Sequence, residues 1–216
     1  MHASGIIFDL DGVLLDTVPA HYEAWQQSFA AHGYGFDPTA YRQLVDGRLA
    51  RDGARAVMPT ATDSDIDDVV EMKERLYRDC VDAGRFEVFP DARDVVERLD
   101  RQGVPMAVAS SSSLASHILG LAGLDSYFAV IVGGNDVARG KPAPDAFLLA
   151  ARHLGLPPEA CLVIEDSTSG LAAARAGGFM AVGLRRSADM DHLGDADLVI
   201  ASLTELATLL WGPACL

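Results

Sequence analysis

Short apolar runs alternate with longer amphipathic segments along most of the chain. Runs rich in Val, Ile, Leu and Ala lie at residues 5–8, 104–110, 128–134, 161–166, 180–184 and 197–202. Each run is flanked by Gly, Pro or Asp, which is typical of strands that are buried and end in turns. The pattern therefore predicts a series of short β-strands.

The segments between these runs have apolar residues at helical spacing, and they lie at residues 91–103, 113–124, 144–156 and 169–178. Two of them end in glycine, at Gly103 and at Gly177, as helix C-termini commonly do. Strands that alternate with helices indicate βαβ units. We therefore expect an α/β fold whose core is a Rossmann-like parallel sheet with helices on both faces.

Residues 18–87 interrupt this alternation with helical patterns alone, at 19–33, 51–58 and 64–84. We expect the interruption to begin after Asp16 and to end at the segment 87–90. The sequence then predicts a discontinuous α/β domain with a small α-helical domain inserted after the first strand. The predicted bounds are 1–15 and 88–216 for the α/β domain and 16–87 for the insert.

Two helices of the insert carry polar residues on apolar stripes. His21, Trp25 and Phe29 are spaced by four residues, and Lys73 lies three residues after Val70 on the stripe of the last predicted helix. Such a lysine either extends along the apolar surface to reach water or points into a cleft. The pattern alone leaves both interpretations open, and the line of His21 is equally compatible with packing.

Composition narrows the classes of function. The chain has 216 residues, of which 50% are hydrophobic and 22% charged, and its formal net charge is -14 with a pI near 4.6. This composition predicts a folded protein with a substantial core. The negative charge disfavours nucleic acids and anionic membranes as partners. An anionic substrate would need a local cationic pocket.

The cysteines and the N-terminal segment bear on location. Cys80, Cys161 and Cys215 are far apart and odd in number, which favours a reduced environment. The apolar run near the N-terminus is too short for a signal peptide, and no run is long enough to span a bilayer. We therefore expect a cytoplasmic protein, and we expect it to be a monomer.

Chemically active side chains follow the predicted strands. They are Asp9 and Asp11 after the first strand, Ser110, Ser111 and Ser112 after the second, Lys141 after the third, and Glu165 with Asp166 at the end of the fourth. In open parallel sheets, ligands bind beyond the carboxyl ends of the strands. Any one of these groups alone fits an ordinary turn or helix cap, but their joint arrangement favours a single site.

These residue types suit phosphoryl transfer through an aspartate. Asp9 would attack phosphorus as the nucleophile, and Asp11 would act as general acid and base. Ser110 would donate a hydrogen bond to the phosphoryl group, and Lys141 would supply positive charge. A Mg²⁺ ion would explain why two carboxylates lie so close together. The expected ligands are Asp9, Asp11 through its backbone carbonyl, Glu165 and Asp166.

A calcium-binding loop is a weaker interpretation of the same acids. An EF-hand needs Gly at its sixth position and Glu at its twelfth. Counting from Asp9, those positions hold Leu14 and Ala20. The sequence therefore does not support this alternative.

The order of FDLDGVLLDT, VASS, GKPAPD and VIEDS resembles the haloacid dehalogenase superfamily of phosphotransferases. Within it, DTVPAHYEAW, VDGRLARDG and KERLY resemble the β-phosphoglucomutase-like branch. The resemblance implies that the helical insert is a cap that closes over the site. It also implies that the partner is a small phosphorylated metabolite, a sugar phosphate. The implied substrate contacts are His21, Trp25, Gly47, Arg51, Lys73, Ser111 and Ser112.

The resemblance has a local departure. In β-phosphoglucomutase a lysine and an asparagine follow the serines of the second motif, and here Ser113 and Leu114 stand in those places. The cap arginine is also one residue out of register relative to its glycine. We therefore favour Mg²⁺-dependent hydrolysis of a small sugar phosphate. The alternative is a mutase that interconverts β-glucose 1-phosphate and glucose 6-phosphate.

Two other classes share part of the motif set. A two-component receiver domain also joins acids, a hydroxyl and a lysine, but its phosphoacceptor comes later in the chain and it lacks an insert of this length. A haloalkanoate dehalogenase uses its aspartate on carbon without a metal. Asp11 and the pair Glu165 and Asp166 argue against that class.

Overall fold

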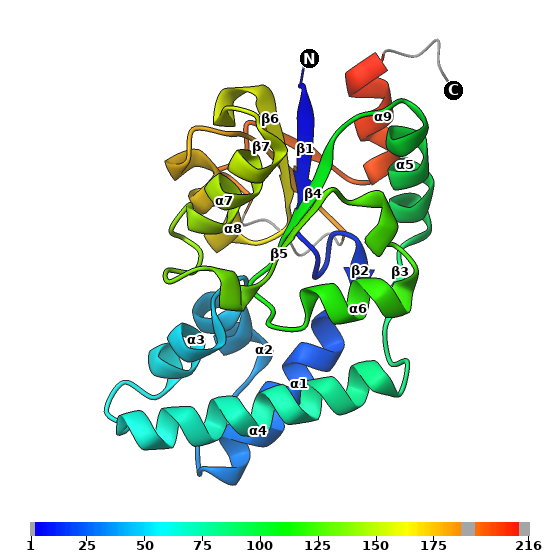
Figure 1. The fold of residues 1–216 in the computed structure, drawn as a ribbon. Helices are drawn as coiled ribbons and strands as arrows, with labels where there is room; N and C mark the ends of the chain where they lie inside the picture. The colour runs from blue at the N-terminus through cyan, green and yellow to red at the C-terminus, as the bar shows by residue number, and fades with distance from the viewer. Residues whose placement is uncertain (1–2, 187–192, 212–216) are drawn as a thin grey trace.

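The computed structural model describes residues 3–186 and 193–211 (Figure 1). Within these residues, six strands form one parallel sheet in the order β5-β4-β1-β6-β7-β8. The strands are β1 (Gly5–Phe8), β4 (Met106–Ala109), β5 (Val130–Val132), β6 (Cys161–Glu165), β7 (Met180–Leu184) and β8 (Leu198–Ile200). All six runs predicted from the sequence are therefore strands.

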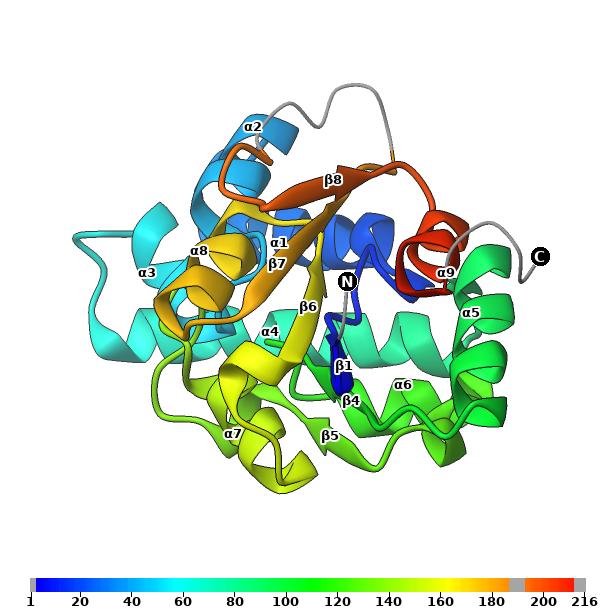
Figure 2. The same cartoon turned by 90° about the horizontal axis from the view of Figure 1, so that it is seen from above.

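Helices cover both faces of this sheet (Figure 2). One face carries α5 (Pro90–Arg101), α6 (Ala115–Ala122) and α9 (Leu203–Trp211). The other carries α7 (Asp145–Leu154) and α8 (Thr168–Ala176). This arrangement confirms the expected α/β class with a Rossmann-like parallel sheet.

The central strand shows why the sheet needs both layers. Side chains alternate between the two faces of a strand. Ile6 and Phe8 are buried in the core cluster that contains Leu119, whereas Ile7 is buried in the cluster that contains Phe147. A parallel strand buried on both faces reads as a continuous apolar run, as β1 does.

Residues after β2 form the helical part, which we define as α1 (Val18–Ala31), α2 (Pro38–Ala40), a π-helical turn (Tyr41–Val45), α3 (Ala50–Val57) and α4 (Asp63–Asp82). In Figure 1 it lies below the sheet, beyond the ends of β1 and β4. It has its own core, in which the rings of Trp25 and Phe29 stack with centroids 5.1 Å apart.

The longest helix of this part begins at a capping box. The backbone N–H of Asp65 donates to the hydroxyl of Thr62 at 3.2 Å, and the Asp65 carboxylate accepts from the backbone N–H of Thr62 at 3.0 Å. These bonds satisfy donors that a helix N-terminus would otherwise leave unpaired. The start of α4 is therefore fixed locally.

The chain enters and leaves the helical part through a short antiparallel ribbon. In it β2 (Leu15–Asp16) pairs with β3 (Glu87–Val88), so that Asp16 lies opposite Glu87. The domain boundaries expected at residues 16 and 87 fall on this ribbon and stay a prediction.

Several elements differ from the expectations. The sequence pattern did not indicate β2, β3, the π-helical turn or α9.

Cys80 and Cys161 are buried free thiols, and Cys215 lies outside the described residues. Within residues 3–186 and 193–211, none of the helices has the length and apolarity that a membrane span requires.

Candidate active site

The turn after β1 places two carboxylates at the carboxyl edge of the sheet. The backbone N–H of Asp9 donates to the carbonyl of Ile164 at 2.9 Å, which continues the pairing between β1 and β6. Gly12 has a φ of +79°, and a Cβ there would lie 2.0 Å from Oδ2 of Asp166. Only glycine tolerates both the conformation and the contact. The turn therefore brings Asp166 against the chain that carries Asp9 and Asp11.

Lys141 joins the acids of two strands. Its Nζ donates to Oδ1 of Asp9 and to Oε1 of Glu165, the latter at 2.6 Å. Burial alone would lower the pKa of Lys141, but Asp9 and Glu165 raise it above its usual range. The side chain is therefore an ammonium that holds the Asp9 carboxylate in place.

Glu165 has partners on both carboxylate oxygens. Oε1 accepts from Lys141, and Oε2 accepts from the backbone N–H and the hydroxyl of Ser167 at 2.7 and 2.9 Å. Ser167 in turn caps α8, because its hydroxyl accepts from the backbone N–H of Gly170 at 3.0 Å. In this arrangement Glu165 orients Lys141, and its expected role as a metal ligand stays a prediction.

Asp11 has four hydrogen-bonding neighbours, of which the hydroxyl of Tyr77 is the most distant, at 3.4 Å from Oδ1. Its Oδ1 accepts from the hydroxyl of Thr17 at 2.6 Å and lies 3.2 Å from Nε2 of His21, and its Oδ2 accepts from the hydroxyl of Ser110 at 3.1 Å. Burial alone would raise the pKa of Asp11, but His21 and the hydroxyls of Thr17 and Ser110 lower it below its usual range. Asp11 is therefore an oriented carboxylate.

The serines after β4 have different surroundings. The hydroxyl of Ser110 also accepts from the backbone N–H of Ser112 at 2.9 Å, and the hydroxyl of Ser112 accepts from that of Leu114 at 3.2 Å. Ser110 and Ser112 are buried. Ser111 instead donates to the backbone carbonyl of Gly47 at 2.6 Å, which links the sheet edge to the helical part.

The cluster of Asp9, Glu165, Asp166 and Asp46 carries more negative than positive charge. Burial, and further the charge of Glu165, raises the pKa of Asp9 well above its usual range. Burial and the charges of Asp46, Glu165 and Asp9 raise the pKa of Asp166 in the same way. Lys141 supplies one positive charge among these carboxylates. A divalent cation would offset the remaining repulsion.

The donors in this turn fit Mg²⁺. Among the described residues there is no set of three or more His, Cys, Asp or Glu side chains arranged to hold a metal ion. Mg²⁺ does not need one, because proteins commonly bind it through one or two carboxylates, and water and substrate phosphate complete the shell. The carboxylates of Asp9 and Asp166 and the backbone carbonyl of Asp11 are the donors that would hold it.

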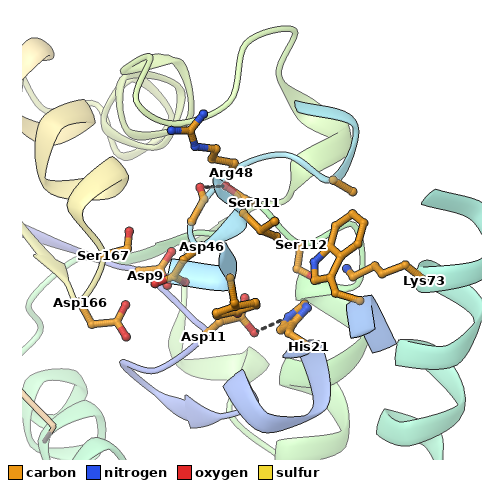
Figure 3. A pocket seen from close by; sticks show the side chains of 15 residues that line it. Asp9, Asp11, His21, Asp46, Arg48, Lys73, Ser111, Ser112, Asp166 and Ser167 are labelled. Atoms are coloured by element: carbon orange, nitrogen blue, oxygen red, sulfur yellow. Dashed lines mark hydrogen bonds and ion pairs between the residues drawn. The ribbon is translucent and has the colours of Figure 1, made fainter. Parts of the chain in front are cut away.

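A pocket lies between this edge and the helical part, and Figure 3 shows Asp9, Asp166 and Ser167 at one end and Lys73 at the other. Its described lining is Asp9, Asp11, His21, Trp25, Tyr41, Val45, Asp46, Gly47, Arg48, Ala50, Lys73, Ser111, Ser112, Asp166 and Ser167. Of the side chains expected to contact substrate, all except Arg51 line this pocket.

Lys73 points into the pocket. It is 3% exposed, and its Nζ lies 5.3 Å from the ring centroid of Trp25 and 5.0 Å from that of Tyr77. Oε1 of Glu74 accepts from it at 2.8 Å. His21 stacks on Tyr77 with centroids 3.7 Å apart. Of the two interpretations left open by the pattern, the structure therefore supports the one in which Lys73 borders a cleft.

Gly47 lies where the helical part meets the sheet edge. It has a φ of +71°, and a Cβ there would lie 2.3 Å from Oγ of Ser169. The preceding carbonyl, of Asp46, accepts from that same hydroxyl at 2.8 Å. Together with the bond from Ser111, this contact holds the helical part against the sheet in this structure.

The structure does not bring Arg51 to the pocket. Its side chain is half exposed and pairs with Asp63 and Asp67 at the start of α4. Arg48 lines the pocket instead. The sequence contains a hint of this, because Arg48 directly follows Gly47. The resemblance to the family instead led us to expect Arg51 in the pocket.

Asp46 is a second pocket residue that sequence reasoning missed. Burial, together with the charges of Glu165 and Asp11, raises the pKa of Asp46 to about 7. The helical part thus contributes a carboxylate that faces the acidic cluster. Its place depends on the turn that ends at Val45, which the apolar pattern did not indicate.

The fold and this site are those of an α/β protein whose candidate reacting groups lie at the carboxyl edge of a parallel sheet, under a helical part. A family profile described as haloacid dehalogenase-like hydrolase matches residues 3–178, and the chain belongs to that family. This confirms the expected superfamily, and it makes the chain an enzyme rather than a signalling module.

A hexitol phosphatase and two β-phosphoglucomutases are similar to nearly the whole chain. Hexitol phosphatase A of Escherichia coli is 32% identical, covering 95% of this chain and 94% of its own length. A β-phosphoglucomutase of Mycobacterium bovis is 35% identical, covering 93% and 90%. The solved β-phosphoglucomutase of Clostridium difficile, 24% identical, shares the fold with a TM-score of 0.85 over 94% of this chain and 93% of that one.

Proposed function

We propose that the protein hydrolyses a small phosphorylated sugar or polyol in a Mg²⁺-dependent reaction that passes through a phosphorylated Asp9. The arrangement that carries this proposal is the pair of acids after β1. Lys141 holds the Asp9 carboxylate, while four hydrogen-bonding neighbours orient Asp11 beside it. A nucleophile and an acid–base group fixed side by side are what a two-step transfer requires.

In the first step a carboxylate oxygen of Asp9 attacks phosphorus and the bond to the ester oxygen breaks. Asp11 gives a proton to the leaving oxygen. In the second step Asp11 takes a proton from water, the water oxygen attacks phosphorus, and phosphate leaves Asp9. The lowered pKa of Asp11 suits the second step directly. A phosphate dianion beside Asp11 would raise that pKa and supports the first step.

The surrounding groups neutralise charge on the phosphoryl oxygens. Mg²⁺, when bound by Asp9, Asp166 and the carbonyl of Asp11, would supply positive charge to these oxygens. Lys141 adds an ammonium, and Ser110 adds a hydroxyl that already bonds Asp11. Glu165 keeps Lys141 in position. Charge stabilisation of this kind carries much of the catalysis in phosphoryl transfer.

The helical part would contact the leaving group. His21, Trp25, Arg48 and Lys73 line the pocket on the side of the helical part and offer donors and an aromatic face. Such a mixture suits a small molecule with several hydroxyl groups. The similar proteins named as a hexitol phosphatase and a β-phosphoglucomutase support a sugar or polyol phosphate.

Hydrolysis is favoured over the mutase alternative. A mutase must hold a bisphosphate at both ends, which calls for a second cationic site. Ser113 and Leu114 offer no charge at the position where the resemblance implies a lysine. The 35% identity to a β-phosphoglucomutase keeps the mutase as the second candidate. The expectations of a monomer, of a cytoplasmic location and of no nucleic-acid partner stay predictions.

A panel of sugar and polyol phosphates tests the proposal. We expect Mg²⁺-dependent release of inorganic phosphate from at least one compound, loss of release with EDTA, and recovery when Mg²⁺ is added back. β-Glucose 1-phosphate is tested with and without the matching bisphosphate. Conversion to glucose 6-phosphate without phosphate release would favour the mutase. Turnover that is independent of divalent metal would contradict the proposed mechanism.

A further inference from the structure

A carboxylate outside the lining of the active-site pocket pairs with Lys73, which lines the end of that pocket opposite Asp9. Glu74 lies on α4 directly after Lys73; its Oε1 accepts from Lys73 Nζ at 2.8 Å and its Oε2 accepts from the hydroxyl of Ser113. Ser113 belongs to the loop after β4, so Glu74 also joins the helical part to the sheet edge. The mechanism above does not use Glu74.

The carboxylate of Glu74 is ionised and balances the positive charge of Lys73. Burial alone would raise the pKa of Glu74, but the Lys73 ammonium and the Ser113 hydroxyl lower it below its usual range. The pair of Lys73 and Glu74 is therefore neutral as a unit. Lys73 keeps N–H donors for substrate hydroxyls, but its positive charge is already balanced.

Glu74 lies between Lys73, which lines the active-site pocket, and a neighbouring cavity. A second cavity of about 410 Å³ is lined by Glu74 and Ser113, and it shares Ala50 and Ser111 with the active-site pocket. The distal end of a substrate whose phosphate lies at Asp9 would point toward this boundary. Of the arginines lining the second cavity, Arg51 is paired with Asp63 and Asp67, and Arg78, one helical turn after Glu74, is exposed.

We propose that Glu74 is a specificity-determining residue that restricts the site to substrates with one phosphate and an uncharged distal end. A second phosphate or a carboxylate at that end would meet Glu74, and like charges brought together in a partly buried site weaken binding strongly. Ser113 is a positioning residue that holds the Glu74 carboxylate at the boundary. This inference rests on the proposed function and narrows its substrate class.

Turnover of matched substrates provides the first test. Fructose 1-phosphate and fructose 1,6-bisphosphate share the phosphate at C1 and differ at the distal end. We expect Glu74→Gln to raise the ratio of kcat/KM for the bisphosphate to kcat/KM for the monophosphate by about tenfold or more, mainly through KM. Glu71→Gln removes an exposed carboxylate from the same helix and should leave the ratio unchanged.

Binding provides a test that does not depend on turnover. Titration calorimetry of the two compounds is carried out on Asp9→Asn and on Asp9→Asn combined with Glu74→Gln, with Mg²⁺ present. The Kd for the bisphosphate relative to the monophosphate should fall by about tenfold or more in the double variant. Ser113→Ala, which keeps the carboxylate and removes its anchor, should shift the same ratio by a smaller factor.

The outcomes separate this inference from the proposed function. Phosphate release from monophosphates with an unchanged ratio in Glu74→Gln would overturn the role of Glu74 alone. An equal rise in Glu71→Gln would overturn it as well, because the effect would then reflect overall charge. If wild type hydrolyses no sugar phosphate, the proposed function fails, and the binding ratio still decides whether Glu74 rejects a second phosphate. If Glu74→Gln does not fold, Ser113→Ala gives the decision.

Discussion

Two buried lysines of the pocket differ in what surrounds them. Lys141 contacts two carboxylates, those of Asp9 and Glu165, and its position is thereby fixed. Lys73 contacts one carboxylate, that of Glu74, and lies over two aromatic rings. In the proposed mechanism the first lysine acts on the reacting phosphoryl group, and the second contacts the remainder of the substrate.

Asp9→Asn should abolish turnover without loss of the fold. The amide cannot attack phosphorus as a carboxylate does, so we expect kcat to fall by about 10³-fold or more. Because burial and neighbouring acids raise the pKa of Asp9, its replacement also relieves repulsion, and Tm should stay the same or rise slightly. Phosphate release and thermal unfolding measure the two effects. Activity near that of wild type would remove Asp9 as the nucleophile.

Among the side chains of the candidate site, the sequence predicts those that directly follow strands. It misses the side chains whose position depends on the packing of the helical part. Asp9 and Ser110 come directly after apolar runs, so their place at the sheet edge follows from the pattern. Arg48 and Glu74 reach the pocket or its boundary through packing of the helical part, which depends on contacts between segments that are distant in sequence. An isolated pattern cannot show which of several arginines makes that contact.

Among the elements, the segment around Gly47 connects the helical part to α8 through close backbone approach. The carbonyls of Asp46 and Gly47 accept from the hydroxyls of Ser169 and Ser111. A Cβ at residue 47 would lie 2.3 Å from Ser169 Oγ and 2.5 Å from Ser167 Oγ. The contact therefore depends on the absence of a side chain there.

Gly47→Ala should lower kcat/KM by about tenfold, because the added methyl group separates the helical part from the sheet edge and moves the pocket side chains. Gly33→Ala is a matched control, since Gly33 also has a positive φ, +80°, but has open space around it. Both variants should lose about 1 kcal/mol of unfolding free energy through backbone strain. Steady-state kinetics and urea unfolding measure the two effects. An equal loss of kcat/KM in both variants would contradict the role of the contact.

The start of α5 is tied to α9 through Asp91. Its carboxylate accepts from Arg186 at 2.8 Å, from the Ser202 hydroxyl at 2.8 Å and from the Leu203 backbone N–H at 2.9 Å. Burial alone would raise the pKa of Asp91, but Arg186 and Ser202 lower it below its usual range. A carboxyl whose pKa is lowered by folding stabilises the folded state above its unfolded pKa, and this contribution is lost as the pH falls.

Asp91→Asn should therefore cost about 1–3 kcal/mol of unfolding free energy at pH 7, as loss of hydrogen bonds to a charged group does. The difference from wild type should shrink as the pH falls below about 4, where the carboxyl of the unfolded chain becomes protonated, and should vanish below the lower pKa of the folded state. Asp94→Asn, at an exposed position of the same helix, is the control and should change little. Urea unfolding at several pH values measures this, and a difference that grows toward low pH would contradict it.

The pattern predicts the elements of the sheet more fully than the others. Strands buried on both faces are continuous apolar runs, and β6 and β7 are clear examples. The ribbon of β2 and β3 has two residues in each strand, too few to show a period. Helix α9 packs into the core beside α5 through Leu203 and Leu206, and although Leu203, Leu206 and Leu210 have helical spacing, the segment is so short that we did not predict a helix there.

For the whole molecule, the net negative charge affects how an anionic substrate approaches the pocket. The net charge of -14 repels an anionic substrate at long range, whereas Arg48 in the pocket lining and Lys141 beside Asp9 attract it at short range. Salt screens the long-range part with a Debye length of about 10 Å at 0.1 M and affects buried contacts much less. Approach and binding should therefore respond to salt in different ways.

We expect kcat/KM for a dianionic sugar phosphate to rise by about two- to fivefold as NaCl increases from 10 to about 100 mM at saturating Mg²⁺. The rise should lie in KM, because kcat reports on the bound state. Initial rates at constant pH measure this. A steady fall of kcat/KM over that range would contradict long-range repulsion and would show that the pocket's own field dominates the approach.

Two of the hydroxyls that join the helical part to the sheet edge, those of Ser169 and Ser111, donate to main-chain oxygens, those of Asp46 and Gly47. Any amino acid at position 46 carries the same carbonyl, so closure does not depend on which side chain stands there. In the proposed function, recognition depends instead on side chains that line the pocket, such as Arg48. Positions 46 and 48 can therefore be randomised to search for new substrate preferences. All variants of such a library should keep the backbone contacts that hold the helical part against the sheet edge.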